Sequence, residues 1–147
     1  MINHRVVESS VFQHFATQFS ASPFHVDAAP FDPSSSETWV QLEVGATQSG
    51  PVRKTGKDVL RVRIIAHCFA RLASDRYTSL AIADQVAALL DHGVIDLRDY
   101  DESGEPSIGT LTLHEVDIRD QSLALDESLR VDWQHVTVSV SGFAIEK

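Results

Sequence analysis

An alternating stretch followed directly by a helical one, residues 59–93, constrains the fold most strongly. The segment VLRVRIIAHCFA places one apolar series on a single parity: Leu60, Val62, Ile64, Ala66 and Cys68. Period-two alternation rich in β-branched residues predicts a half-buried strand. Ser74 and Asp75 then offer N-cap oxygens, and the next apolar series has helical spacing: Ile82, Ala83, Val86, Leu89 and Leu90. Gly93 is expected at the left-handed position that ends this helix. The whole stretch therefore predicts a long strand that leads into a helix lying across a sheet.

The remaining segments extend this plan. Residues 4–19 predict an amphipathic helix, since Val7, Val11, Phe15 and Phe19 recur at every fourth position. Residues 22–36 hold three prolines and four serines. They therefore predict no regular element but an extended arm or loop at 20–36, pinned to a neighbouring surface by its apolar members Phe24, Val26 and Phe31.

Three further strands are expected, at residues 37–46, 108–118 and about 129–145. The first has one apolar face, formed by Val40, Leu42 and Val44. A change of parity in each of the other two indicates a bulge, in the last strand near Gln134 and His135. The order α-β-β-α-β-β predicts one α+β domain over residues 1–147, with a four-stranded, mostly antiparallel sheet and helices packed on one face.

Composition narrows the class of protein. The chain has 147 residues and a net charge of −9, which argues against a dedicated nucleic-acid binder because phosphate affinity depends on clustered Lys and Arg. No apolar run approaches the roughly 20 residues that cross a bilayer, and the first ten residues lack the apolar core of a signal peptide. Cys68 is the only cysteine and is expected to be a buried, inert thiol. We expect synthesis in the cytoplasm.

The charge is unevenly distributed. Residues 51–76 contain seven basic residues against two acidic ones, whereas residues 91–132 contain twelve acidic residues against three arginines. Both runs can be solvated surface. Alternatively, the basic edge of one copy faces the acidic edge of another.

No catalytic, cofactor-binding or metal-binding motif is visible. The seven histidines lack HxH, HExxH or Cys-His spacing, although His67, His114 and His135 could converge if their strands were neighbours. No nucleophile-elbow, Walker or Rossmann glycine pattern occurs. The acidic loop around Asp99 lacks the ligand spacing of a calcium loop. The sequence therefore predicts no enzyme, no cofactor and no metal.

The plan of the chain resembles the tail-terminator, or tail-completion, proteins of tailed bacteriophages. Three segments carry the likeness: the strand pair TWVQLEVGATQSG and VLRVRIIAHCFAR, the helix DRYTSLAIADQVAALLDHG that follows it, and the closing strand RVDWQHVTVSVSGFAIE. The leading helix with Phe12, Phe15 and Phe19 also fits. The likeness lies in the order of the elements and their residue composition rather than in an invariant motif, and it covers most of the chain.

The resemblance implies a structural role in the virion, at the head-proximal end of the tail. Such proteins form a ring, typically hexameric, that caps the tail tube, stops its polymerisation and joins the tail to the head connector or stopper protein. DNA passes through the ring without sequence-specific binding, which suits an acidic subunit. The residues expected to dock subunits or the tube are Arg53, Lys54, Lys57, Arg61, Arg63, Asp99, Asp101, Glu102 and Glu105.

Two alternatives stay open at this stage. One is a head-completion or connector component of the same particle. The other, of a different class, is a small α+β ligand-binding domain or enzyme, which a convergent polar pocket with perturbed carboxylates or histidines would favour.

Overall fold

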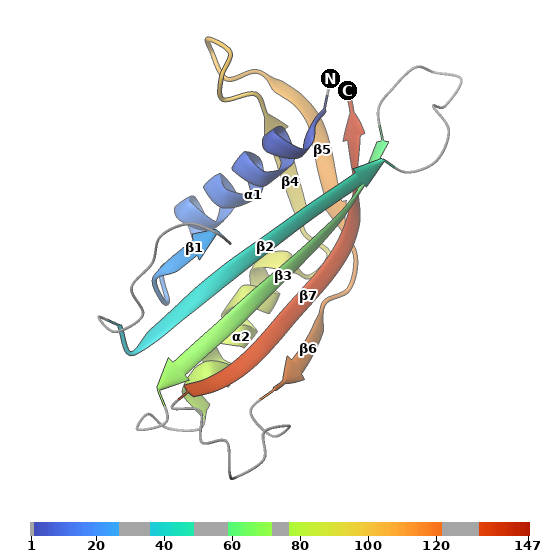
Figure 1. Cartoon of the computed structure of the whole chain (residues 1–147). Helices are drawn as coiled ribbons and strands as arrows, with labels where there is room; N and C mark the ends of the chain where they lie inside the picture. The colour runs from blue at the N-terminus through green and yellow to red at the C-terminus, as the bar shows by residue number, and fades with distance from the viewer. Residues whose placement is uncertain (1, 27–35, 49–58, 72–76, 122–132) are drawn as a thin grey trace.

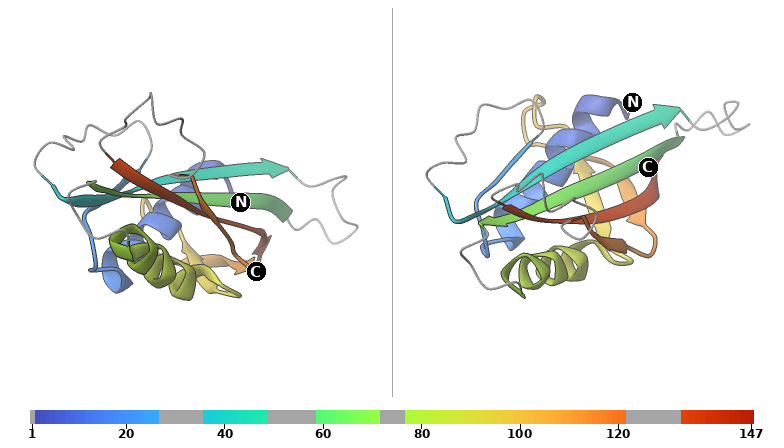
Figure 2. Two further views of the ribbon diagram at one scale, coloured as in Figure 1. Left: turned by 90° about the horizontal axis from the view of Figure 1, so that it is seen from below. Right: turned by 60° about the horizontal axis from the view of Figure 1, so that its bottom comes forward.

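Two helices and seven strands make up the part of the chain that the computed structural model describes, residues 2–26, 36–48, 59–71, 77–121 and 133–147. They are α1 (His4–Gln18), β1 (Phe24–Val26), β2 (Thr38–Gln48), β3 (Val59–Arg71), α2 (Tyr77–Leu90), β4 (Val94–Arg98), β5 (Ser107–Leu113), β6 (Asp117–Asp120) and β7 (Trp133–Glu146). The strands form one curled sheet, and both helices pack into a single core with it (Figures 1 and 2). Neither described helix is long and apolar enough to cross a membrane.

The sheet has the strand order β1-β2-β3-β7-β5-β4, with β6 paired to β7. All pairings are antiparallel except the parallel pairing of β1 with β2. The three long strands β2, β3 and β7 cross the molecule together, and β5 and β4 curl away behind them toward α1 (Figure 1). The termini lie at the same end as the β4–β5 loop (Figure 1).

The predicted four-stranded sheet in the order α-β-β-α-β-β is wrong. The sheet has seven described strands and is mixed rather than four-stranded. The missed strands are short: β1 has three residues and β4 has five, and segments of that length show too few alternations for a periodic pattern to be recognised. The prediction that residues 22–36 form no regular element is also wrong, because β1 lies there and pairs with β2.

The segment predicted as one strand over 108–118 is two strands, β5 and β6, and both pair with β7. Leu113 pairs with Gly142 and Asp117 pairs with Ser139, so one more residue separates the pairs on the β5–β6 side than on β7. In place of the expected bulge within one strand, residues 114–116 form a break between two strands. The bulge expected near Gln134 and His135 is absent, since the pairing of β3 with β7 continues through both residues without a shift.

Two glycines permit the close approach of β5 and β7 where the sheet curves. A Cβ atom on Gly142 would lie 2.1 Å from the carbonyl oxygen of Thr112, and one on Gly109 would lie 2.6 Å from that of Ile145. Any side chain at either position would push the two strands apart. The curl that brings β4 round to α1 therefore depends on these residues.

Helix α1 lies between the two ends of the curled sheet and packs against both β2 and β4. The side chain of Asn3 caps it by accepting a hydrogen bond from the Val6 N–H at 3.0 Å. Val7, Val11 and Phe15 are fully buried, as the four-residue spacing predicts. Phe24 of β1 packs against this stripe, its ring tilted and its centroid 5.8 Å from that of Phe15, so the first part of the predicted arm is pinned. Phe31 lies outside the described residues.

Helix α2 buries one arc that includes Ile82, Val86 and Leu90 and exposes the opposite side, as predicted. The predicted caps Ser74 and Asp75 lie outside the described residues. The predicted left-handed position is wrong by one residue: His92, with φ of 51°, adopts it instead of Gly93. A Cβ at Gly93 would lie 3.1 Å from the carbonyl oxygens of Leu89 and Leu90, so the helix end leaves little room for a side chain there.

One face of β3 lies at the centre of the core. Val62, Ile64, Ala66 and Cys68 are fully buried, which confirms the predicted parity. Burial raises the pKa of the Cys68 thiol to about 12, so the thiolate is scarce at neutral pH and the sulfur acts as a core side chain.

Candidate assembly surface

The side of β2, β3 and β7 that faces away from the core forms a five-row surface, here called the outer face. Strand pairing aligns its side chains in the rows Trp39–Phe69–His135, Gln41–His67–Thr137, Glu43–Ile65–Ser139, Gly45–Arg63–Ser141 and Thr47–Arg61–Phe143. All of these residues except Trp39 are half-buried or exposed. The outer face changes from aromatic at one end to basic at the other.

The aromatic end is packed upon itself. The ring centroids of Trp39 and Phe69 are 5.0 Å apart, and those of Phe69 and His135 are 4.5 Å apart, both in stacked geometry. Trp39 is only 6% exposed although it points away from the core. The strand predicted to have a single apolar face therefore buries its tryptophan on the other face as well.

A hydrogen-bonded chain of three titratable side chains follows in the next rows. His67 Nε2 lies 2.5 Å from Glu43 Oε2, and His67 Nδ1 lies 3.0 Å from His135 Nε2. Burial, followed by the charge on His67, lowers the pKa of His135, while Asp120 opposes the shift.

The suggested meeting of three histidines is only partly correct. His67 and His135 are in contact, but His114 lies edge-on to the ring of Phe143 with centroids 5.7 Å apart. Among the described residues no group of three or more His, Cys, Asp or Glu side chains could hold a metal ion.

The basic end of the outer face carries two exposed arginines. Arg61 lies over the ring of Phe143, 5.9 Å from its centroid, which is a cation–π distance. Within the described part of the chain, neither Arg61 nor Arg63 takes part in an ion pair. Arg53, Lys54 and Lys57, predicted to act with them, lie outside the described residues.

The predicted acidic residues lie in the β4–β5 loop, which is tightly hydrogen-bonded. The N–H of Asp99 donates to the carbonyl of Pro106 at 3.1 Å, and the Asp99 side chain accepts from the N–H of Asp101 at 3.0 Å. Glu102 and Glu105 continue the turns, and Glu105 has φ of 47°. Asp101, Glu102 and Glu105 are exposed, and Arg5 pairs with Asp101 at 2.9 Å. The loop therefore presents its carboxylates on a fixed backbone.

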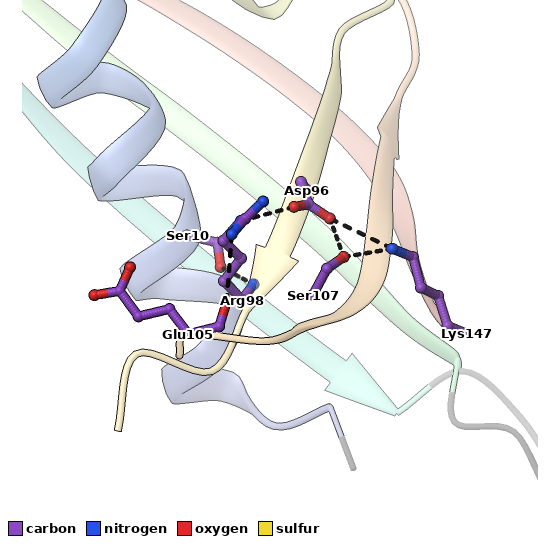
Figure 3. Close-up of polar contacts among 6 residues, drawn as sticks. All are labelled: Ser10, Asp96, Arg98, Glu105, Ser107 and Lys147. Carbon is purple, nitrogen blue, oxygen red and sulfur yellow. Dashed lines mark hydrogen bonds and ion pairs between the residues drawn. The ribbon is translucent and has the colours of Figure 1, made fainter. Parts of the chain in front are cut away.

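A polar network holds the base of this loop (Figure 3). Asp96 accepts from Arg98 Nε at 2.8 Å and from the hydroxyl of Ser107, and Lys147 reaches the same hydroxyl. The Ser107 bond first, then Arg98 and Lys147, hold the pKa of Asp96 below its ordinary value. The N–H of Arg98 donates to Ser10 Oγ on α1 at 3.1 Å, so β4, β5, β7 and α1 all fix the loop (Figure 3).

A depression of about 360 Å³ between α1 and β4 is where an enzyme site would be sought, since His14, Asp96 and Tyr100 line it. Burial lowers the pKa of His14 and raises that of Tyr100. Burial accounts for both shifts, and a hydrogen bond to the backbone of Leu89 opposes the shift of His14. Asp96 already belongs to the network above. In the described part of the chain no hydrogen bond joins these three side chains, so they form no nucleophile–base pair here.

The structure thus places the predicted residues at two separate sites, the arginines on β3 and the carboxylates on the β4–β5 loop, and does not bring them together within one copy. Sequence reasoning missed the Glu43–His67–His135 chain. Alternation with the core positions shows in the sequence that Glu43, His67 and His135 each face away from the core. Their contact could not be predicted, because it depends on the register of three paired strands.

Comparison with known proteins rests on the fold. No protein-family model matches the sequence, and no curated protein matches it significantly. Among solved structures, a chain from the virion of a native gene transfer agent particle is similar, with a TM-score of 0.60 and 16% identity over 96% of this chain and 95% of that one. A second solved chain, which carries no functional description, has a TM-score of 0.52 and 10% identity over 100% and 97% of the two chains. At these identities the likeness concerns the fold.

Proposed function

We propose that this chain is a structural protein of a phage-like virion, and not an enzyme. The observation that carries the proposal is the fold likeness to a chain of a gene transfer agent virion, which extends over 96% of this chain. Almost the whole molecule is matched, so the likeness is not confined to one common motif such as a strand–helix unit.

Within the virion, the role proposed is tail terminator. The order and residue composition of the strand pair, helix and closing strand support this role. The outer face that these strands form supports it as well. A ring that contacts a tube and a connector needs broad, exposed docking areas rather than a deep pocket. The outer face and the fixed acidic loop are such areas.

The partners follow from that role. Copies associate into a hexameric ring, one side of which caps the tail tube protein while the other meets the head connector or stopper protein. DNA passes through the hole. A net charge of −9 is compatible with that passage, because a lumen rich in Lys and Arg would retain the phosphates.

The experiment is deletion of the coding sequence from the genome of the particle that encodes it, followed by electron microscopy of the lysate. A tail terminator predicts tails of uncontrolled length that are not joined to heads, and restoration of normal particles by the intact gene supplied in trans. Normal-length tails lying apart from heads would contradict the terminator role and favour a head-completion component. Intact, infectious or transfer-competent particles would contradict a virion function altogether.

A further inference from the structure

We infer that the basic end of the outer face is the docking site for the β4–β5 loop of a second copy of this chain. The contact is head to tail, with Arg61 and Arg63 of one copy facing Glu102 and Glu105 of the next. The inference deepens the proposed function by naming the residues through which the ring closes, and it rests on that function only for the number of copies.

The first argument is the state of the two arginines. In the described part of the chain, Arg5, Arg98, Arg119 and Lys147 all have a carboxylate within ion-pair distance, whereas Arg61 and Arg63 have none. Both lie on the central strand β3, two residues apart and therefore on the same face. An acidic chain that leaves two neighbouring guanidinium groups unpaired on an exposed sheet face has a surface suited to an acidic partner.

The second argument is the state of the loop. Its turns are fixed by backbone hydrogen bonds and by the Asp96 network, so ordering it on binding costs little entropy. The side chains of Glu102 and Glu105 are exposed, and within the described residues no cation pairs with either. The loop thus presents carboxylates on a rigid backbone. These are the partners that Arg61 and Arg63 lack within one copy.

The third argument concerns direction. The basic end is formed by β2, β3 and β7, and the loop projects from β4 and β5 beside α1, so they are different patches of one molecule (Figure 1). Contact between two different patches is heterologous, and repetition of such a contact closes a ring or extends a filament. A nucleic-acid partner fits less well, because Glu115 and Asp117 lie beside Arg63 in the adjoining depression.

The test uses the full chain and measures its mass in solution, at about 0.01 M and about 1 M salt, where the screening length is roughly 30 Å and roughly 3 Å. The parent is expected to associate at low salt and to dissociate at high salt. The double variants Arg61→Glu/Arg63→Glu and Glu102→Lys/Glu105→Lys should each associate about tenfold more weakly at low salt, while melting at the parent's temperature.

Mixing the two double variants gives the sharpest readout. Within each variant the two patches carry the same sign, but every contact between the two variants pairs opposite signs. The mixture should therefore assemble, with the variants alternating, although each variant alone associates only weakly. The single variant Glu102→Lys should also weaken association. Its charge-matched control is Asp84→Lys, a reversal at an exposed residue of α2, which should leave association unchanged.

Three results would overturn the inference: a parent that stays monomeric at low salt, double variants that associate as the parent does, or a mixture that stays monomeric. Loss of duplex-DNA retention in Arg61→Glu/Arg63→Glu without any change in mass would assign the arginines to nucleic acid instead. Failure here is distinguishable from failure of the proposed function, since the deletion experiment reads tail length independently of these residues.

Discussion

The two ends of the outer face differ in how many contacts their side chains make within one copy of the chain. At the aromatic end, Trp39 stacks on Phe69, Phe69 stacks on His135, and His135 bonds His67. At the basic end, Arg61 and Arg63 are exposed and have no carboxylate among the described residues. The difference indicates that the aromatic end stabilises the fold, whereas the basic end is available for association. Mutations at the two ends should therefore separate stability from assembly.

The largest effect is expected from Trp39→Ala. Removal of a large, almost fully buried aromatic side chain leaves a cavity and an unstacked Phe69, at a cost of about 3–5 kcal/mol in unfolding free energy. Chemical denaturation is the measurement. Thr47→Ala, in the exposed row at the basic end, is the control and should change stability by no more than about 0.5 kcal/mol. Equal losses for both variants would remove the distinction between the ends.

A smaller effect is expected from Ser79→Ala. The buried Ser79 hydroxyl on α2 donates to Gln134 Oε1 at 3.0 Å, next to His135 on β7. Loss of this donor should lower the unfolding free energy by about 1–3 kcal/mol, because it weakens a hydrogen bond in a buried site. Ser141→Ala, an exposed serine on β7, should be neutral. A neutral Ser79→Ala would show that α2 does not support the aromatic end through this bond.

Two half-buried histidines, His14 and His135, should make the stability of the fold depend on pH. Burial lowers the pKa of His135 and of His14, so just below the ordinary histidine pKa of about 6.5 the unfolded chain binds protons that the folded chain does not. Stability should therefore be fully present above about pH 6.5 and fall as the pH falls below it. Denaturation at several pH values should show a shallower fall for His135→Gln than for the parent. An identical dependence of unfolding free energy on pH in the variant and the parent would show that His135 does not cause the fall.

The smallest effect on the single copy is expected at the basic end. Arg61→Ala and Arg63→Ala should each change unfolding free energy by at most about 0.5 kcal/mol, since neither is buried or ion-paired in the described structure. A loss above about 2 kcal/mol in thermal or chemical unfolding would mean that the arginines serve the fold itself.

Periodicity predicted the parts of this molecule that are long and amphipathic. The core parity of β3 and the buried arcs of both helices followed from it, because burial of one face imposes a strict pattern over many residues. It could not give β1 and β4, which are too short to show a period. The bulge predicted in β7 is wrong because the apolar Val131 and Trp133, on the opposite parity from Val136 and Val138, resemble a register shift, whereas the pairing with β3 is continuous from Trp133 onward.

The site was predicted less completely than the fold. The charged residues of β3 and the β4–β5 loop stand out in the sequence, but their separation in space depends on the curl of the sheet. The curl in turn depends on the close approach of strands at Gly109 and Gly142, which no local sequence pattern predicts. The Glu43–His67–His135 chain required the register of three strands, which are brought together by long-range pairing.

The most direct test of the account is an image reconstruction by cryo-electron microscopy of tails from particles that carry this chain. The account predicts a closed ring of copies at the head-proximal end of the tail tube, with the outer-face arginines of each copy against loop 99–106 of the next. Copies located anywhere else in the particle, or a ring in which Arg61 and Arg63 face solvent, would contradict it.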